Sequence, residues 1–240
     1  MQTLLLIKLI IKSVILDFGG TLVEGDIKWG PYHKSMRNLL KRYDPETSVE
    51  DIRESLRVSI DKLHEVRATG KELTFEEVYN DFLERLGIPV DLDLLEKLHD
   101  NFKDQYKSTF FDCTREVLEK LSTRYKVALL SNTMSDQPHI LLNDFGYDRY
   151  FDVIVCSRDV GVRKPNPEAF RIILDRLDTS PELTVHVGDS VEADMYGARN
   201  SGITGIWIRT PDQPKWNGHT IDSICELPNF IKNLDNSKQS

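Results

Sequence analysis

The stretch S-V-I-L-D-F-G-G-T-L, residues 13–22, decides the fold. Val14, Ile15 and Leu16 form a continuous apolar run of strand length, and the two glycines that follow cannot prolong a regular element. We therefore expect a buried strand that ends at Asp17. Open α/β sheets bind ligands at the carboxyl ends of their strands. Asp17 is either a site residue or an aspartate that caps a turn, and the polar residues downstream decide between the two.

The chain after Phe111 alternates between short apolar runs and helical patterns. Strands are expected at 127–130, 153–155, 185–187 and 205–208, and helices near 116–121, 138–145 and 191–200. A further helix is expected to begin at Pro167, with Asn166 as its cap, because proline suits the first helical position. The alternation predicts an α/β fold with a doubly wound, mostly parallel, Rossmann-like sheet that helices cover on both faces.

A helical segment interrupts this pattern from about residue 29 to 107. Helices are expected over 32–41, after Ser48, over 75–86 and over 92–106. Ser48 with Asp51, and Thr74 with Glu77, form capping-box patterns at the starts of the second and third helices. Four helices joined by short polar loops predict a bundle. We expect a core over 1–24 and 109–240, with an inserted all-helical domain over 25–108.

Composition and charge exclude several classes of protein. With 240 residues, 40% of them hydrophobic, the chain can form one large core or a core that carries a smaller domain. The net charge of -8 argues against a nucleic-acid partner, because phosphate backbones require a basic surface. Cys113, Cys156 and Cys225 are odd in number and scattered, which suggests neither a disulfide framework nor a structural zinc site. A reducing, cytoplasmic setting is expected.

The two ends of the chain carry weaker signals. The opening M-Q-T-L-L-L-I-K-L-I-I-K is not expected to be a secretion signal, because Lys8 and Lys12 interrupt it and no small-residue cleavage site follows. It is also too short to span a membrane. Residues before about Ser13 either extend the first strand or were added by an upstream start codon. The polar tail 233–240 is expected to fray, and the oligomeric state leaves no sign in the sequence.

Polar residues of complementary chemistry follow the predicted strands. The triplet Ser131-Asn132-Thr133 offers a hydroxyl and backbone N–H groups near a helix start, which suits a phosphate, although alone it would indicate a turn with a helix cap. Lys164 lies in G-V-R-K-P-N-P, where the following proline imposes an extended backbone. That brace aims one ammonium at an anion, whereas an ordinary lysine is a solvated charge. Arg163 is expected to be the solvated neighbour.

Two more acids follow a strand in V-H-V-G-D-S-V-E-A-D. Asp189 is expected at the strand end and Asp194 on the first turns of the next helix, where both could share a site with Asp17. Three carboxylates in one crevice raise one another's pKa unless a cation neutralises them, and hard oxygen ligands suit Mg²⁺ better than zinc or copper. Helix capping is the competing role. Glu192 is expected to be solvated and His186 to be a core histidine.

The order D-F-G-G-T-L, S-N-T, K-P-N-P and G-D-S-V-E-A-D resembles the haloacid dehalogenase superfamily over residues 13 to about 210. The resemblance implies that Asp17 is the nucleophile and Lys164 the charge-neutralising lysine. It assigns phosphate or substrate binding to Ser131, Asn132, Gly20 and Lys164, with Ser131 also counted as catalytic. Asp17, Asp189, Asp194 and the carbonyl of Gly19 would hold Mg²⁺. The helical insert would be a substrate-selecting cap, and the residues after Gly20 a mobile flap.

Gly19 departs from the family pattern, which usually has a second aspartate there as general acid and base. Phosphoryl transfer relies mainly on positioning and charge neutralisation, and a missing acid/base costs on the order of 10²- to 10⁴-fold. We expect an Mg²⁺-dependent phosphatase of a small phosphorylated metabolite. The alternatives are a metal-free dehalogenase, which Asp189 argues against, and a binding or regulatory protein on a weakened scaffold, for which Gly19 is the only support.

Substrate selection and leaving-group protonation are assigned to residues around the start of the insert. Trp29, Tyr32 and His33 are candidate selectors, although packing within the bundle explains each of them equally well. With no carboxyl group at position 19, the proton must come from water or from Glu24, Asp26 or His33.

Overall fold

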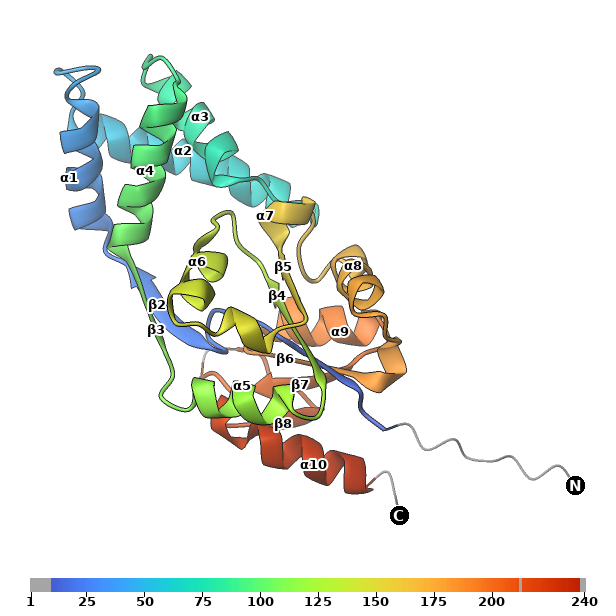
Figure 1. Ribbon diagram of the computed structural model, residues 1–240. Helices are drawn as coiled ribbons and strands as arrows, with labels where there is room; N and C mark the ends of the chain where they lie inside the picture. Colours follow the sequence, from blue (N-terminus) through green and yellow to red (C-terminus); the bar gives the residue numbers. More distant parts are fainter. Residues whose placement is uncertain (1–9, 212, 238–240) are drawn as a thin grey trace, which may run out of the picture.

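The computed structural model describes residues 10–211 and 213–237, and its centre is a six-stranded parallel sheet (Figure 1). The strand order is β5-β4-β1-β6-β7-β8, so the chain winds outward in both directions from β1. The bounds are β1 Ser13–Leu16, β4 Lys126–Ser131, β5 Val153–Cys156, β6 Thr184–Gly188, β7 Thr204–Ile208 and β8 His219–Ile221. The doubly wound α/β fold and its five predicted strands are confirmed. The edge strand β8 was not predicted, because three residues form no recognisable apolar run.

Helices cover both faces of the sheet. Successive side chains of β1 point in opposite directions, so Val14 and Leu16 pack on one face and Ile15 on the other. The first face is covered by α5 Thr114–Ser122, α6 Gln137–Asp144 and α10 Leu227–Ser237, and the second by α8 Pro167–Leu177 and α9 Gly197–Asn200. Asn166 caps α8, as expected. Residues expected to form a helix at 191–200 instead form a π-helical segment, Val191–Tyr196, followed by α9.

The expectation of a frayed tail was wrong for residues 233–237, which belong to α10. Leu227 and Ile231 anchor this helix in the core. The buried carboxylate of Asp235 accepts hydrogen bonds from the backbone N–H of Ile11 and the hydroxyl of Tyr125, both at 3.1 Å. These contacts outweigh the polar composition of the segment. Residues 238–240, and residues 1–9 on whose origin two readings were kept, lie outside the described part of the chain; within it, β1 begins only at Ser13.

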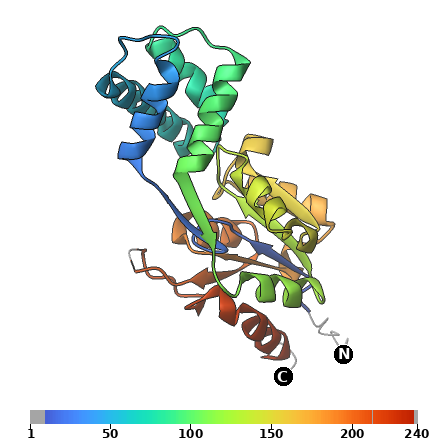
Figure 2. The same cartoon turned by 60° about the vertical axis from the view of Figure 1, so that its left-hand side comes forward.

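The insert forms the upper body of the molecule in Figures 1 and 2. Its helices are α1 Trp29–Leu40, α2 Val49–Ala68, α3 Phe75–Arg85 and α4 Leu92–Gln105, and they enclose a hydrophobic cluster of their own. Both predicted capping boxes are present, Ser48 with Asp51 and Thr74 with Glu77. Two antiparallel strands, β2 Val23–Ile27 and β3 Tyr106–Phe110, lead into and out of the helices. This ribbon was not predicted, and it crosses both expected boundaries of the insert.

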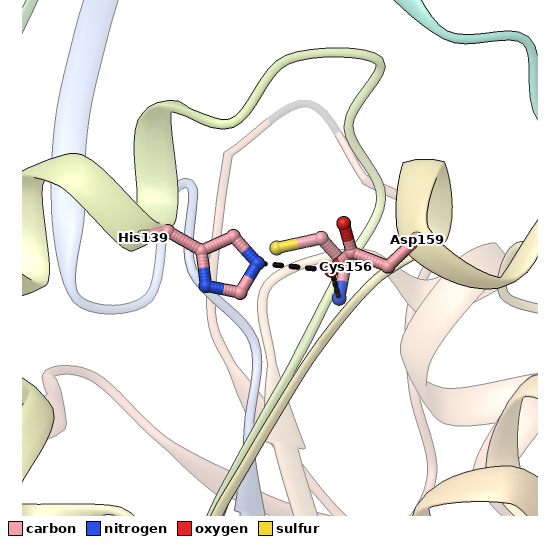
Figure 3. Close-up of side chains that lie close together, drawn as sticks. All are labelled: His139, Cys156 and Asp159. Carbon is pink, nitrogen blue, oxygen red and sulfur yellow. Dashed lines mark hydrogen bonds and ion pairs between the residues drawn. The ribbon is translucent and has the colours of Figure 1, made fainter.

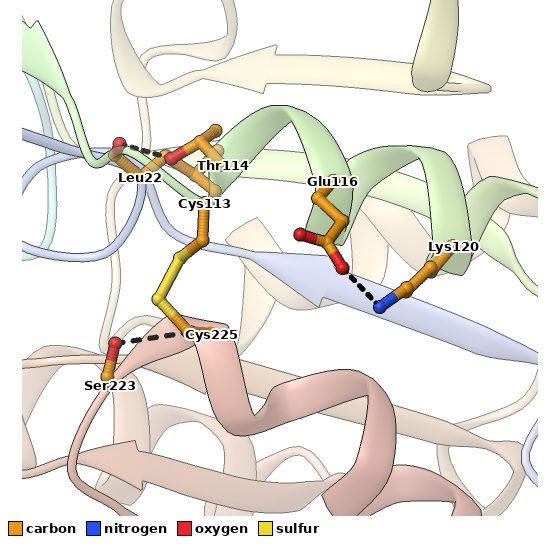
Figure 4. The surroundings of a disulfide bond; sticks show 7 residues. All are labelled: Leu22, Cys113, Thr114, Glu116, Lys120, Ser223 and Cys225. Atoms are coloured by element: carbon orange, nitrogen blue, oxygen red, sulfur yellow. Dashed lines mark hydrogen bonds and ion pairs between the residues drawn. A yellow bond between two sulfur atoms is a disulfide. The ribbon is translucent and has the colours of Figure 1, made fainter.

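A disulfide joins Cys113 to Cys225, 112 residues away (Figure 4). The inference that the cysteines suggest no disulfide framework was therefore wrong for this pair, and with it the cysteine argument for a reducing compartment. Spacing could not reveal the pair, because it forms only when α5 and the turn before α10 pack together on the same side of the sheet. Cys156 is free and buried. Within the described residues, no helix has the length and apolar character needed to cross a membrane.

Candidate active site

A buried lysine and two buried carboxylates form the centre of the candidate site. Asp17 directly follows β1, and its Oδ1 lies 2.6 Å from Nζ of Lys164. The same ammonium donates to Oδ1 of Asp194, also at 2.6 Å. Lys164 is only 2% exposed, so the expectation that the proline-braced lysine points at an anion is confirmed. Burial alone would lower the pKa of Lys164, but Asp17 and Asp194 raise it more, which keeps the ammonium charged.

Asp189 brings a third carboxylate to this centre. Asp17, Asp189 and Asp194 each offer an oxygen within 4.8 Å of the others. Burial, together with the charges of Asp17 and Asp194, raises the pKa of Asp189 to about 7. Burial also raises the pKa of Asp17, even with Lys164 beside it. One ammonium cannot neutralise three carboxylates, so the donor set fits a hard divalent cation such as Mg²⁺.

Asp194 is held more firmly than the other two acids. Its Oδ1 also lies 2.9 Å from Nε2 of His186, and its Oδ2 accepts from the backbone N–H of Ser190 at 3.0 Å. Burial raises the pKa of Asp194, but Lys164 and His186 more than offset this and bring it below its ordinary value. His186 is buried in β6, as expected, yet its ring contacts a site residue. That role was missed, because a strand histidine between two valines reads as core.

In the loop after β1, Gly20 lies close against the carboxylate of Asp189. Gly20 has a φ of +74°, and a Cβ there would lie 2.2 Å from Oδ2 of Asp189. Only glycine allows this approach without moving the carboxylate. Gly19 differs, since a Cβ at that position would have no atom within 4 Å. Of the two glycines, Gly20 is therefore required by the close packing, whereas Gly19 is not.

The triplet that begins at the last residue of β4 supports the lysine. Ser131 is buried at the strand end, 4% exposed. The Asn132 side chain donates to the carbonyl of Lys164 at 2.9 Å and accepts from its N–H at 2.8 Å. The side-chain amide of Asn132 therefore binds the backbone of Lys164, so the direct role of Asn132 is to position that lysine.

A cavity of about 530 Å³ opens between the insert and this end of the sheet. The core contributes Gly19, Gly20, Ser131 and Asn132 to its wall, together with neighbouring residues. The insert contributes Trp29 and one face of α2, formed by Ile60, Leu63, His64 and Arg67. The face of α2 was missed in the sequence, although spacings of three and four residues place these side chains on one side of a helix.

The other residues proposed for substrate selection and protonation lie elsewhere. Tyr32 is fully buried and its hydroxyl hydrogen bonds to that of Tyr79, so it packs within the bundle. His33 is buried as well and, like Glu24 and Asp26 on β2, does not line the cavity. Arg163 was wrongly expected to be solvated: its side chain is 18% exposed and pairs with Glu72 at 3.2 Å. Glu192 is exposed, as expected.

A second group of side chains, His139, Cys156 and Asp159, lies beside β5 (Figure 3). Nε2 of His139 is 2.9 Å from Oδ2 of Asp159, and that oxygen also accepts from the backbone N–H of Cys156 at 3.2 Å. Burial, followed by the charge of Asp159, raises the pKa of the Cys156 thiol. The thiol therefore stays protonated, and the carboxylate of Asp159 is hydrogen-bonded within this group by His139 and by the backbone of Cys156.

Comparisons with known proteins point to one family of enzymes. The family model of the haloacid dehalogenase-like hydrolases matches residues 11–202. The chain is 30% identical over 140 residues to glyceraldehyde 3-phosphate phosphatase of Methanothermobacter thermautotrophicus, which covers 55% of this chain and 62% of that protein. The matched stretches cover 62%, 33% and 53% of the lengths of three curated relatives, which is less than two thirds of each relative.

Solved structures share the fold over nearly the whole chain. The HAD phosphatase from Thermococcus onnurineus has a TM-score of 0.63 at 25% identity, covering 92% of this chain and 98% of that one. The 2-haloacid dehalogenase from Pseudomonas syringae pv. Tomato has a TM-score of 0.67 at 20% identity, covering 94% and 100%. The second likeness shows the fold alone.

Proposed function

Because the chain belongs to the haloacid dehalogenase-like hydrolases, we propose that it is an Mg²⁺-dependent phosphatase that hydrolyses a small phosphorylated metabolite. The observation that carries the proposal is the buried lysine held between Asp17 and Asp194, with Asp189 as a third carboxylate. An aspartate beside a lysine and an acidic cation site provides a nucleophile with charge neutralisation on both sides of a phosphoryl group. The phosphatase relative supports the same substrate class.

Each residue has a distinct part in the proposed reaction. A carboxylate oxygen of Asp17 attacks phosphorus, the bond from phosphorus to the ester oxygen breaks, and the phosphoryl group remains on Asp17. Water then attacks the same phosphorus and loses a proton to the solvent, the bond from phosphorus to the Asp17 oxygen breaks, and phosphate is released as the carboxylate is restored. Lys164 neutralises charge on the phosphoryl oxygens, and Ser131 donates its hydroxyl to one of them.

The metal site would consist of Asp17, Asp189 and Asp194, with the carbonyl of Gly19. Bound Mg²⁺ would neutralise the repulsion between the phosphate and the carboxylates. Asp194 would have a second part as well, because its Oδ1 accepts a hydrogen bond from Lys164 and holds that ammonium in place. Asp189, whose carboxylate lies against Gly20, would supply a further oxygen ligand.

Residues 25–108 would act as a cap over the cavity, joined to the core by the β2–β3 ribbon. Trp29, His64 and Arg67 would then contact the part of the substrate beyond its phosphate. His64 and water become the proposed proton sources for the leaving group, in place of Glu24, Asp26 and His33. The proposed location is the cytoplasm, on the strength of the substrate class alone.

Two other functions were considered for the same scaffold. A haloacid dehalogenase attacks carbon without a metal and also lacks the second aspartate, but a third, half-buried acid such as Asp189 has no use in that chemistry. A binding or regulatory protein would explain Gly19, but it would not need a buried lysine between two acids. The phosphatase proposal accounts for all of these residues.

The test is a panel of phosphate esters that includes glyceraldehyde 3-phosphate, assayed for phosphate release with Mg²⁺ and with chelator. We expect release only with Mg²⁺, and none from Asp17→Asn, since an amide is a far poorer nucleophile. Circular dichroism of the variant serves as the folding control. Substantial turnover by a folded Asp17→Asn protein, or unchanged turnover in chelator, would contradict the proposal.

A further inference from the structure

Glu72 is a buried carboxylate on the insert whose contacts reach into the core. It lies between α2 and α3, and its side chain is 0% exposed. Its Oε1 accepts from Nε of Arg67 at 2.7 Å, within the insert. Its Oε2 accepts from Ser157 at 2.8 Å and from Arg163 at 3.2 Å, both in the core. A buried charge is retained at a cost unless its partners are fixed around it, so this group marks a defined docking point.

Backbone hydrogen bonds reinforce the docking point. The N–H of Glu72 donates to the carbonyl of Gly161 at 3.0 Å, and the N–H of Arg163 donates to that of Gly70 at 3.1 Å. Lys71 and Val162 form an isolated antiparallel bridge between these bonds. Figure 1 shows the end of α2 beside α7, Ser157–Val160. The insert therefore touches the core here by a short strand-like contact, away from the β2–β3 ribbon.

Both core partners of Glu72 lead directly to the candidate site. Ser157 accepts from the backbone N–H of Thr133 at 2.8 Å, in the triplet that contains Ser131. Arg163 precedes Lys164, whose backbone is held by Asn132 of the same triplet. The carboxylate of Glu72 thus bridges the loop that carries the phosphate-binding hydroxyl and the loop that carries the lysine. Lys164 in turn contacts Asp17 and Asp194.

We propose that Glu72 is a positioning residue, which fixes the 131–133 and 161–164 segments of the core only when the insert is docked. Docking of the cap would in this way complete the phosphate-binding side of the site. The inference rests on the proposed phosphatase function for its kinetic consequence, but its structural consequence can be measured without any activity. A displacement of about 1 Å in such groups costs up to about 100-fold in rate.

The experiment compares the wild-type chain with Glu72→Gln and with Glu54→Gln as a matched control. Glu54 also pairs with an arginine of α2, but on the solvent-exposed side. Hydrogen exchange should become faster in peptides covering 131–135 and 161–164 of Glu72→Gln, with β7 unchanged. With para-nitrophenyl phosphate and saturating Mg²⁺, kcat should fall about ten- to hundredfold. Glu54→Gln should match the wild type in every measurement.

A purely structural role predicts a different pattern. Glu72→Gln would then lower the free energy of unfolding, but kcat per folded molecule and exchange in the two segments would equal the wild-type values, and this overturns the proposal. If Glu72→Gln does not fold, Arg163→Gln removes the ion pair from the core side and must show the same two effects; wild-type behaviour there overturns the proposal too. An inactive wild type would refute the phosphatase function, whereas the exchange measurement would still decide the role of Glu72.

Discussion

Substituting Gly20 by alanine tests the geometry of the loop between Asp17 and Asp189. The added Cβ would lie 2.2 Å from Oδ2 and 2.6 Å from Cγ of Asp189, so the carboxylate must move. The φ of +74° is a left-handed conformation, which costs a residue with a Cβ about 1–2 kcal/mol. We expect Gly20→Ala to lose about that much free energy of unfolding, and to bind Mg²⁺ about 10- to 100-fold more weakly, as when the supports of metal ligands are removed.

Gly19→Ala is the matched control for this prediction, because its Cβ would meet no atom within 4 Å. Its free energy of unfolding should stay within about 0.5 kcal/mol of the wild-type value, as for substitutions without a special role. Urea denaturation measures the free energies, and calorimetric titration measures Mg²⁺ affinity. Equal stability and equal Mg²⁺ affinity of the two variants would refute the argument from close approach.

Three further predictions concern other parts of the molecule. With no acid at position 19, kcat/KM should fall as the pKa of the leaving group rises, and Gly19→Asp should flatten that dependence. A flat wild-type profile with chemistry rate-limiting would mean that a side chain such as His64, and not water, supplies the proton. A hydrogen bond from Arg85 holds the pKa of Asp81 well below its ordinary 3.8. Asp81→Asn should therefore lower the free energy of unfolding by about 1 kcal/mol at neutral pH, and by progressively less below pH 3.8. A loss independent of pH in urea titrations would contradict this. Reducing the Cys113–Cys225 disulfide, which closes a loop of 112 residues, should lower the free energy of unfolding by up to about 4.7 kcal/mol, and an unchanged urea midpoint in reductant would contradict it.

Much of the core could be predicted because local patterns and packing agree there. The run before Asp17 is apolar on both faces of the sheet, which is why β1 was predicted together with the residue that ends it. The proline after Lys164 fixes the backbone locally, and the Lys164 ammonium points at an anion, the carboxylate of Asp17, as predicted. In each case a local pattern, an apolar run or a proline, fixes the backbone, although the ion pair of Lys164 with Asp17 joins residues that are 147 positions apart.

The features that were missed depend on contacts between distant segments. An arginine is expected at the surface by its residue type, but Arg163 is covered where it pairs with Glu72, which is 91 residues away in the chain. The strands β2 and β3 are each too short to stand out, and they exist because they pair with each other across the whole insert. The partners Cys113 and Cys225 meet only in the folded core. Long-range pairing of this kind leaves no periodic trace in either segment.

Asp17 is proposed to become phosphorylated during turnover, and acid quenching can trap the phosphoryl group on it. The protein is mixed with Mg²⁺ and the fastest substrate of the panel, quenched in acid within one turnover, digested, and analysed by mass spectrometry. We predict a phosphoryl group on the peptide that contains Asp17, absent when Mg²⁺ is replaced by chelator and absent from Asp17→Asn. Rapid phosphate release with no phosphorylated peptide at any quench time, or with the label on another residue, would contradict the account.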